Sequence, residues 1–312
     1  MTKFEPISDP IIVQEVAPRD GLQIEPTWVP TEEKVRLIDA FSDLGFSRIE
    51  VSSFVSPKAV PALRDAAEVF ARIKRNPDII YVALVPNERG ADDALAAGAD
   101  ELNLVMSVSQ THNLANMRMT GEASFAAFQA IAKKPRGKAT LNGSIATSFG
   151  CPFEGDQPEQ RVLDLVRRYL DLGVDGVSLA DTTGMANPRQ VRALVDKALK
   201  LVPPGALTLH FHNTRGLGLA NVLAAYDAGA RRFDSALGGL GGCPFAPGAT
   251  GNICTEDLVN MCHEMGIATG LDLETLIQLS RILPPLLGHD VAGQVMKAGR
   301  NCDLHTAPAL VR

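Results

Sequence analysis

Hydrophobic and polar positions repeat along the chain: an amphipathic helix ends at a glycine, and a short apolar strand begins one to three residues later. This junction recurs at residues 37–51, 94–107, 168–181 and 225–236. Each has a glycine where a helix commonly ends in the left-handed conformation, which glycine adopts without the steric cost of a Cβ atom: these are Gly45, Gly98, Gly173 and Gly229. The short apolar strands are typical of a parallel sheet covered by helices.

Eight strand–helix units can be counted in this way. We expect strands at residues 11–17, 47–52, 79–84, 101–107, 139–147, 176–180, 207–212 and 232–236, and helices that include 32–44, 59–74, 158–172, 188–202, 218–228 and 256–264. Strict alternation over eight units favours a closed (β/α)8 TIM barrel over an open sheet or two domains. We therefore predict an α/β fold with one catalytic domain over residues 1–312. Its barrel spans about 11–265, and a C-terminal extension at about 271–312 holds one helix, at 273–287, and a polar tail.

The composition is that of a folded globular protein, since 46% of the 312 residues are hydrophobic and 21% are charged. A net charge of −6 without a basic cluster, and only 5% aromatic residues, argue against nucleic acid as a partner. The five cysteines are scattered and form no CxxC pair, which indicates a reducing compartment. No apolar run reaches the roughly 18 residues of a membrane span, and no export signal is present, so we expect a cytoplasmic protein without a membrane partner.

Polar residues collect where the expected strands end. In a TIM barrel these ends share one rim, which carries the catalytic groups. The residues concerned are Arg19, Asp20, Gln23, Glu50, Ser52, Ser53, Asn103, Ser107, Thr147, Ser148, Asp181, Thr182, Thr183, His210 and His212.

The sharpest local signal is the His210-Phe211-His212 tripeptide. Residues two apart on a strand point to the same side, so both imidazoles face the barrel mouth. Asp20 lies at the end of the first strand, and strands 1, 7 and 8 adjoin when the barrel closes. The two imidazoles and this carboxylate then form the type of facial site that binds a divalent ion. A pair of core histidines bonded to their neighbours is the alternative.

The segment 238–252 is too long for a plain connector, with fifteen residues that include six glycines and two prolines. Cys243 follows two of these glycines, where backbone can approach a ligand closely, and a thiol there could exchange protons. A small buried apolar residue is the alternative, and it is the interpretation that we favour for Cys151, Cys254 and Cys262.

Four of the rim residues have structural alternatives. Arg19 and Asp20 could form an exposed ion pair instead of holding an oxyanion and a metal. Glu50 could pair with Arg48 or another cation at the rim. Asp181 could cap the helix that follows it.

The motifs PRDGLQ (18–23), IEVSSFVSPKAVP (49–61), DTTG (181–184), HFH (210–212) and GGLGGCPFAPGATGN (238–252) together resemble the 3-hydroxy-3-methylglutaryl-CoA (HMG-CoA) lyase family from about residue 11 to about 290. The resemblance implies a TIM barrel that uses Mg²⁺ or Mn²⁺ to cleave this CoA thioester into acetyl-CoA and acetoacetate. The metal ligands that it implies are Asp20, His210, His212 and Asn252. Arg19 would stabilise enolate charge, Glu50 and Asp181 would orient substrate or ligands, and the Cys243 thiol would transfer a proton.

The resemblance also implies a role in leucine degradation and a homo-oligomer, either a dimer or a tetramer. Alternatives are a lyase for citramalyl-CoA or an isoprenoid-extended hydroxyglutaryl-CoA, a condensing synthase, and a non-catalytic metal- or CoA-binding barrel. One departure is Arg215, in a segment that reads Asn-Thr-Arg-Gly where the family has Asp-Thr-Tyr-Gly. Arg215 could meet a carboxylate or a CoA phosphate, and further phosphate candidates, on charge alone, are Lys58, Arg89 and Arg118.

Overall fold

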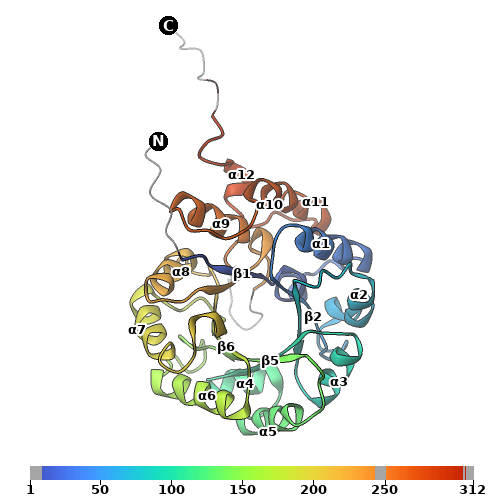
Figure 1. The fold of residues 1–312 in the computed structure, drawn as a ribbon, viewed down its shortest axis with the longest axis vertical. Coiled ribbons are helices and arrows are strands. Elements are labelled where there is room, and N and C mark those ends of the chain that lie inside the picture. Colours follow the sequence, from blue (N-terminus) through green and yellow to red (C-terminus); the bar gives the residue numbers. More distant parts are fainter. Residues whose placement is uncertain (1–8, 243–250, 305, 307–312) are drawn as a thin grey trace.

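Eight parallel strands close into a barrel in chain order, and β1 pairs with β8 to complete it (Figure 1). A computed structural model of the chain describes residues 9–242, 251–304 and 306. The predicted TIM barrel is therefore confirmed. The strands are β1 (Ile12–Glu15), β2 (Arg48–Ser53), β3 (Ile80–Val85), β4 (Glu101–Ser107), β5 (Thr140–Ala146), β6 (Gly176–Asp181), β7 (Leu207–Phe211) and β8 (Arg232–Ser235).

Helices surround this barrel as an outer ring (Figure 1). They are α1 (Thr31–Asp43), α2 (Ala66–Arg72), α3 (Glu88–Ala96), α4 (Gln110–Met117), α5 (Gly121–Ala132), α6 (Glu159–Leu172), α7 (Pro188–Ala198) and α8 (Gly218–Asp227). The ring is completed by α9 (Thr255–Glu264), which follows β8. The C-terminal extension holds α10 (Leu273–Ser280), α11 (Leu283–Leu287) and α12 (Val295–Ala298), which gather beside α1 and α9.

Most strand residues are buried on both faces of the sheet, and the two sets of side chains along a strand have different roles. All of β7 is buried, and its apolar Phe211 packs against Phe149. Alternate positions of the same strand, Thr208 and His210, bond to side chains of the neighbouring strand β8 inside the barrel. The sequence alternation thus separates an apolar layer beneath the helices from a polar interior that leads to the site.

The four glycines predicted to end helices all have the left-handed conformation, with φ of 94° at Gly45, 83° at Gly98, 83° at Gly173 and 105° at Gly229. This confirms the junction from which the units were counted. A side chain would be strained there, because L residues rarely adopt positive φ.

Two predicted helices differ from the structure because of prolines. The helix expected over 59–74 is only α2, since the chain first makes a short 3-10 turn at Pro61–Leu63. The helix expected over 273–287 is wrong as a single element: α10 ends at Ser280 and α11 begins at Leu283. Pro284 and Pro285 have no N–H to donate and cannot continue the first helix. Among the described residues, no helix combines the length and the hydropathy needed to span a bilayer.

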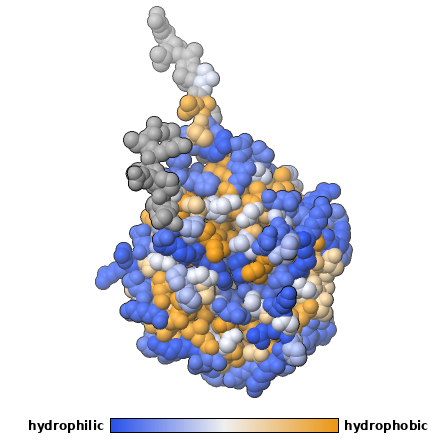
Figure 2. All heavy atoms as spheres, in the orientation of Figure 1, coloured by the Kyte–Doolittle hydropathy of each residue, from blue (hydrophilic) through white to orange (hydrophobic). Residues whose placement is uncertain are grey.

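Hydrophilic and hydrophobic residues are interspersed on the face seen in Figure 2.

The C-terminal extension packs against the barrel at Gly238, the first glycine after β8. Leu283 and Val291 lie so close to Gly238 that a Cβ atom there would be 2.7 and 3.2 Å from their side chains. The backbone N–H of Gly293 also donates to the carbonyl of Gly238, at 3.1 Å. Contacts from the extension therefore reach the segment that leads into the site.

Candidate active site

A wide turn directly after β1 carries the first two site residues. Residues Ala17–Gly21 form one π-helical turn in which the N–H groups of Arg19, Asp20 and Gly21 all approach the carbonyl of Val16, at 2.8–3.2 Å. The strand predicted over residues 11–17 ends earlier, at Glu15. Single π turns of this kind occur often at functional sites. Here the turn places two adjacent charged side chains, both buried, at the barrel mouth.

Arg19 joins two carboxylates. Its Nε lies 2.6 Å and its Nη2 2.5 Å from Oε2 of Glu50, while its Nη1 pairs with Oδ1 of Asp20. The other Glu50 oxygen accepts from Nδ2 of Asn103, at 2.9 Å. Glu50 therefore does not pair with Arg48, which instead pairs with Glu101 deeper in the barrel.

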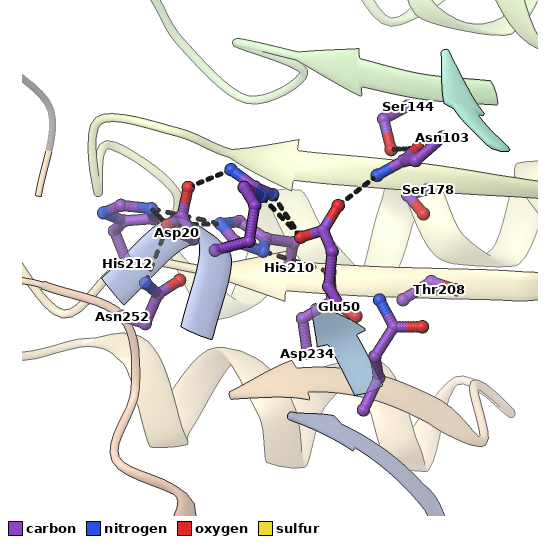
Figure 3. A network of polar contacts seen from close by, with 12 residues as sticks. Asp20, Glu50, Asn103, Ser144, Ser178, Thr208, His210, His212, Asp234 and Asn252 are labelled. Carbon is purple, nitrogen blue, oxygen red and sulfur yellow. Dashed lines mark hydrogen bonds and ion pairs between the residues drawn. The ribbon is translucent and has the colours of Figure 1, made fainter. Parts of the chain in front are cut away.

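His210, in β7, and His212, just after it, lie close to Asp20, as the sequence predicted (Figure 3). The Nε2 atoms of His210 and His212 are 3.0 Å apart, and Oδ2 of Asp20 lies 3.9 and 3.6 Å from them. Asn252 donates from Nδ2 to the same Asp20 oxygen, at 2.8 Å, and to the carbonyl of Leu240, at 2.9 Å. Gln23 donates to Oδ1 of Asp20.

The charges of these groups are strongly coupled. Burial acts to raise the pKa of Asp20, but the positive charge of Arg19 and the contact with His212 hold it well below its usual range. Burial likewise acts to lower the pKa of Arg19, and the charges of Glu50 and Asp20 more than offset it. Asp20 is thus a carboxylate, and Arg19 is a permanent cation beside the cavity.

The donor set fits a divalent cation. Oδ1 of Asn252 and Nδ1 of His212 are buried without a hydrogen-bond partner among the described residues. The Asn252 amide is oriented by its two acceptors, so the oxygen is the free atom. Carboxylate, imidazole and amide-oxygen ligands together suit Mg²⁺, Mn²⁺ and related divalent ions.

A cavity opens beside this cluster at the carboxyl ends of the strands. The walls are partly apolar, with Val55, Val60 and Met117, and the floor is polar, with Ser144 and Ser178. His112 and Asn116 of α4 also line the cavity, although no sequence signal placed that helix at the rim. The region thus offers a polar, charged end and an apolar wall to a ligand, as small-molecule sites commonly do.

Asp181 lies apart from this cavity. Its Oδ1 accepts from the N–H groups of Met185 and Ala186, at 2.8 and 3.1 Å, and so holds the turn that follows β6. Burial raises its pKa. The cap of α7 is Asn187, not Asp181.

The remaining cationic candidates lie elsewhere. Arg215 donates from Nη1 to the carbonyls of Thr183 and Gly184, at 3.0 and 2.9 Å, and so ties down the same turn. The three further phosphate candidates are exposed and do not line the cavity: Lys58, Arg89 and Arg118. Cys243 lies outside the described residues.

The cysteines interpreted as small buried residues are buried: Cys151, Cys254 and Cys262. Burial raises the pKa of the Cys262 thiol to about 12. Cys302 is exposed.

Asp234 is the residue that sequence reasoning missed. It lies in β8 directly opposite His210 in the strand register, and its Oδ2 is 3.1 Å from Nδ1 of that histidine. Burial acts to lower the pKa of His210, but the hydrogen bond to Asp234 and the charge of Asp20 raise it. The available signal was an acidic residue inside a short buried strand. Asp234 is two positions after Arg232, and residues two apart on a strand face the same side.

Residues 10–283 match the family model described as HMGL-like. The chain belongs to the HMGL-like family. Hydroxymethylglutaryl-CoA lyase YngG of Bacillus subtilis is 42% identical over 284 residues, which cover 91% of this chain and 95% of that protein. An (R)-citramalyl-CoA lyase of Chloroflexus aurantiacus is 41% identical over 300 residues, which cover 93% and 95% of the two chains.

The HMGL-like fold is also found in a solved structure of high similarity. An HMG-CoA lyase from Acinetobacter baumannii, in complex with coenzyme A and 3-methylmalate, is 65% identical with a TM-score of 0.95. The match covers 98% of this chain and 100% of that chain. The resemblance found in the sequence is thereby confirmed, and the relatives named here are carbon–carbon lyases.

Proposed function

We propose that this HMGL-like chain is a divalent-metal-dependent carbon–carbon lyase that cleaves HMG-CoA into acetyl-CoA and acetoacetate. The observation that carries the proposal is the buried group of Asp20, His210 and His212, beside the Arg19–Glu50 pair at the carboxyl ends of the strands. Relatives named HMG-CoA lyases, 42% and 65% identical, support this substrate.

The proposed cation is Mg²⁺ or Mn²⁺, held by Asp20, His210, His212 and Asn252. When bound, such an ion lowers the pKa of a hydroxyl that it ligates and neutralises developing negative charge. Asn252 contributes its free Oδ1, since Nδ2 is engaged by Asp20 and Leu240.

The chemistry divides among the chain's own residues. Cleavage requires that a base take the proton of the tertiary hydroxyl, and Asp20 and an imidazole of the pair are the two candidates. The C–O bond then becomes the ketone carbonyl of acetoacetate, and the C2–C3 bond breaks with its electron pair passing to C2. The resulting enolate of acetyl-CoA carries charge on the thioester oxygen, which the Arg19 guanidinium stabilises. The Cys243 thiol donates a proton to C2.

Glu50 and Asp181 act through other groups. Glu50 accepts from two nitrogens of Arg19 and so sets the direction of the remaining N–H groups of the guanidinium. Asp181 holds the turn after β6 through Met185 and Ala186. We propose both as positioning carboxylates.

A second candidate substrate is citramalyl-CoA, which is favoured by the 41% identical relative named (R)-citramalyl-CoA lyase. Its cleavage would require the same steps and would give acetyl-CoA and pyruvate. An isoprenoid-extended hydroxyglutaryl-CoA would demand a longer cavity for its tail.

The test is a panel of these three thioesters, in which acetyl-CoA release is measured together with the keto-acid product. We expect the highest kcat/KM with HMG-CoA and stoichiometric acetoacetate, loss of turnover with EDTA, and recovery with Mg²⁺ or Mn²⁺. Pyruvate from citramalyl-CoA at a higher kcat/KM would replace the proposed substrate. Turnover that persists after complete chelation would contradict the metal requirement. Condensation of acetyl-CoA with a 2-oxo acid, without cleavage, would indicate a synthase.

We further propose a cytoplasmic homo-oligomer, either a dimer or a tetramer, that acts in leucine degradation on a small-molecule acyl-CoA. Light scattering on the eluting size-exclusion peak measures the mass directly. A mass near the 33.3 kDa of one chain would contradict the oligomer.

A further inference from the structure

The barrel interior holds one carboxylate that contacts a proposed metal ligand without belonging to the ligand set. Asp234 is buried in β8, and its Oδ2 lies 3.1 Å from Nδ1 of His210 (Figure 3). The two residues are register partners, so the backbone pairing of β7 and β8 fixes their separation. Asp234 also lines the cavity, and its Oδ1 has no hydrogen-bond partner among the described residues.

This contact selects one of the two neutral forms of the His210 ring. A neutral imidazole carries its proton on Nδ1 or on Nε2, and the other nitrogen carries a lone pair. A carboxylate can only accept, so Asp234 requires the proton on Nδ1. The lone pair is then on Nε2, which faces His212 at 3.0 Å and Asp20 at 3.9 Å.

The second histidine lacks this support. Nδ1 of His212 is buried without a hydrogen-bond partner in the part of the chain that the structure describes. The two imidazoles are therefore held differently: the protein fixes the ring of His210 through a carboxylate, whereas the ring of His212 has only its Nε2 contacts.

We propose that Asp234 is a positioning residue that holds His210 in the Nδ1–H tautomer and so presents the Nε2 lone pair to the divalent cation. The predicted effect on metal binding rests on the proposed function, whereas the predicted tautomer of His210 concerns the metal-free protein alone. Carboxylates behind a histidine ligand commonly change metal affinity by about 10–100-fold when removed.

The first measurement uses the wild-type protein. Long-range ¹H–¹⁵N spectra of ¹⁵N-histidine-labelled, metal-free protein distinguish the tautomers at a pH where the ring is neutral. We expect the proton of His210 on Nδ1. A wild-type signal with the proton on Nε2 would overturn the proposal without any variant.

The second measurement compares Asp234→Asn with Asp175→Asn. The carboxamide that Asp234→Asn introduces has the size of the carboxylate but can donate to Nδ1 of His210, which would move the ring proton to Nε2, where it blocks the lone pair. Asp175 makes a control because it is a carboxylate that accepts a hydrogen bond, from the N–H of Leu141, but does not line the cavity.

We expect Asp234→Asn to shift the tautomer to Nε2–H and to weaken Mn²⁺ binding about 10–100-fold, as read from free Mn²⁺ by EPR titration. Asp175→Asn should change neither. An unchanged tautomer, or a Mn²⁺ affinity within about twofold of wild type, would refute the positioning role. If wild-type protein bound no Mn²⁺, the proposed metal-dependent function would fail, and the tautomer spectra would still decide the role of Asp234.

Discussion

Arg19 is the residue on which the geometry of the site depends most directly, because one guanidinium contacts both Asp20 and Glu50. We predict that Arg19→Met lowers kcat/KM by at least about 10²-fold, the usual cost of removing one preorganised donor to an oxyanion. Arg19→Lys should also be impaired, since a single ammonium cannot replace the planar fork. Steady-state kinetics with the preferred thioester measure both effects. Arg36→Met, at an exposed arginine, is the control, and equal rates in all three variants would contradict the role.

Cys243 is the candidate proton donor and can be tested against another cysteine of the same chain. Cys243→Ala should lower kcat by about 10²–10⁴-fold, the range of general acid–base contributions, with an unchanged melting temperature. Cys302→Ala, at an exposed thiol, should leave kcat unaltered. If Cys243→Ala retained wild-type kcat, another group would have to protonate the enolate.

At the scale of elements, one buried carboxyl group links three segments of the barrel mouth. Glu15, the last residue of β1, accepts from the N–H of Ala17 at 2.8 Å, the N–H of Leu237 at 3.0 Å and Oγ1 of Thr255 at 2.7 Å. The π turn that carries Arg19 and Asp20 is thus tied to the turn after β8 and to α9. Burial is the main cause that raises the pKa of Glu15, to about 8, and that of nearby Glu256, to about 7.

These pKa values predict a pH-dependent stability. The folded state binds the Glu15 proton more tightly than the unfolded state does, where the ordinary value is 4.5. The stabilising contribution is therefore complete below about pH 4.5 and is lost as the pH rises to about 8, by roughly 4–5 kcal/mol as an upper limit. Glu256 acts in the same direction up to about pH 7.

Glu15→Gln removes this titration while the side chain keeps its shape and its acceptor oxygen. The free energy of unfolding, measured in urea at several pH values, should fall less steeply for Glu15→Gln than for wild type between about pH 4.5 and 8. Glu264→Gln, at an exposed position of α9, should follow the wild-type slope. Parallel slopes for all three proteins would show that Glu15 is not the group responsible.

The sequence was sufficient for those elements whose signal is local. The helix ends at Gly45, Gly98, Gly173 and Gly229 are determined by residues within a few positions in the sequence, and so is the inward direction of His210 and His212. Both features were predicted correctly. Glu15 and Asp234 were missed because their partners are distant along the chain: Thr255 is 240 residues from Glu15, and His210 is 24 residues from Asp234. Such pairings become visible only when the register of the closed barrel is known.

At the scale of the whole molecule, buried charged and polar side chains occupy the barrel interior below the site. Arg48 pairs with Glu101, and Arg232 contacts Thr208. Burial, with the charge of Arg48, lowers the pKa of Arg232 to about 10. Removing one member of the Arg48–Glu101 pair would leave an uncompensated buried charge, which is strongly destabilising. The interior is thus held by polar contacts, while the apolar core lies between sheet and helices.

The C-terminal extension raises the question of whether the barrel and its added helices are one unit. We propose that residues 1–312 form a single domain. Leu283 is fully buried against Gly238, and α9 is linked to α12, since Asp257 accepts from the N–H groups of Gln294 and Val295. Such packing should make the extension unfold together with the barrel.

Leu283→Ala tests this coupling, with the adjacent Ile282→Ala as its matched control. Leu283 is 0% exposed and Ile282 is 45% exposed, so the two truncations differ in burial at almost the same place in the chain. Loss of the buried leucine should cost about 2–5 kcal/mol, and the exposed isoleucine far less. In calorimetry the leucine variant should keep one transition at a lower temperature. An early second transition, with the main one unmoved, would mean that the extension unfolds independently. Because Leu283 supports Gly238, at the start of the segment that ends in Asn252, the same variant should also weaken Mn²⁺ binding, which a separate domain would leave intact.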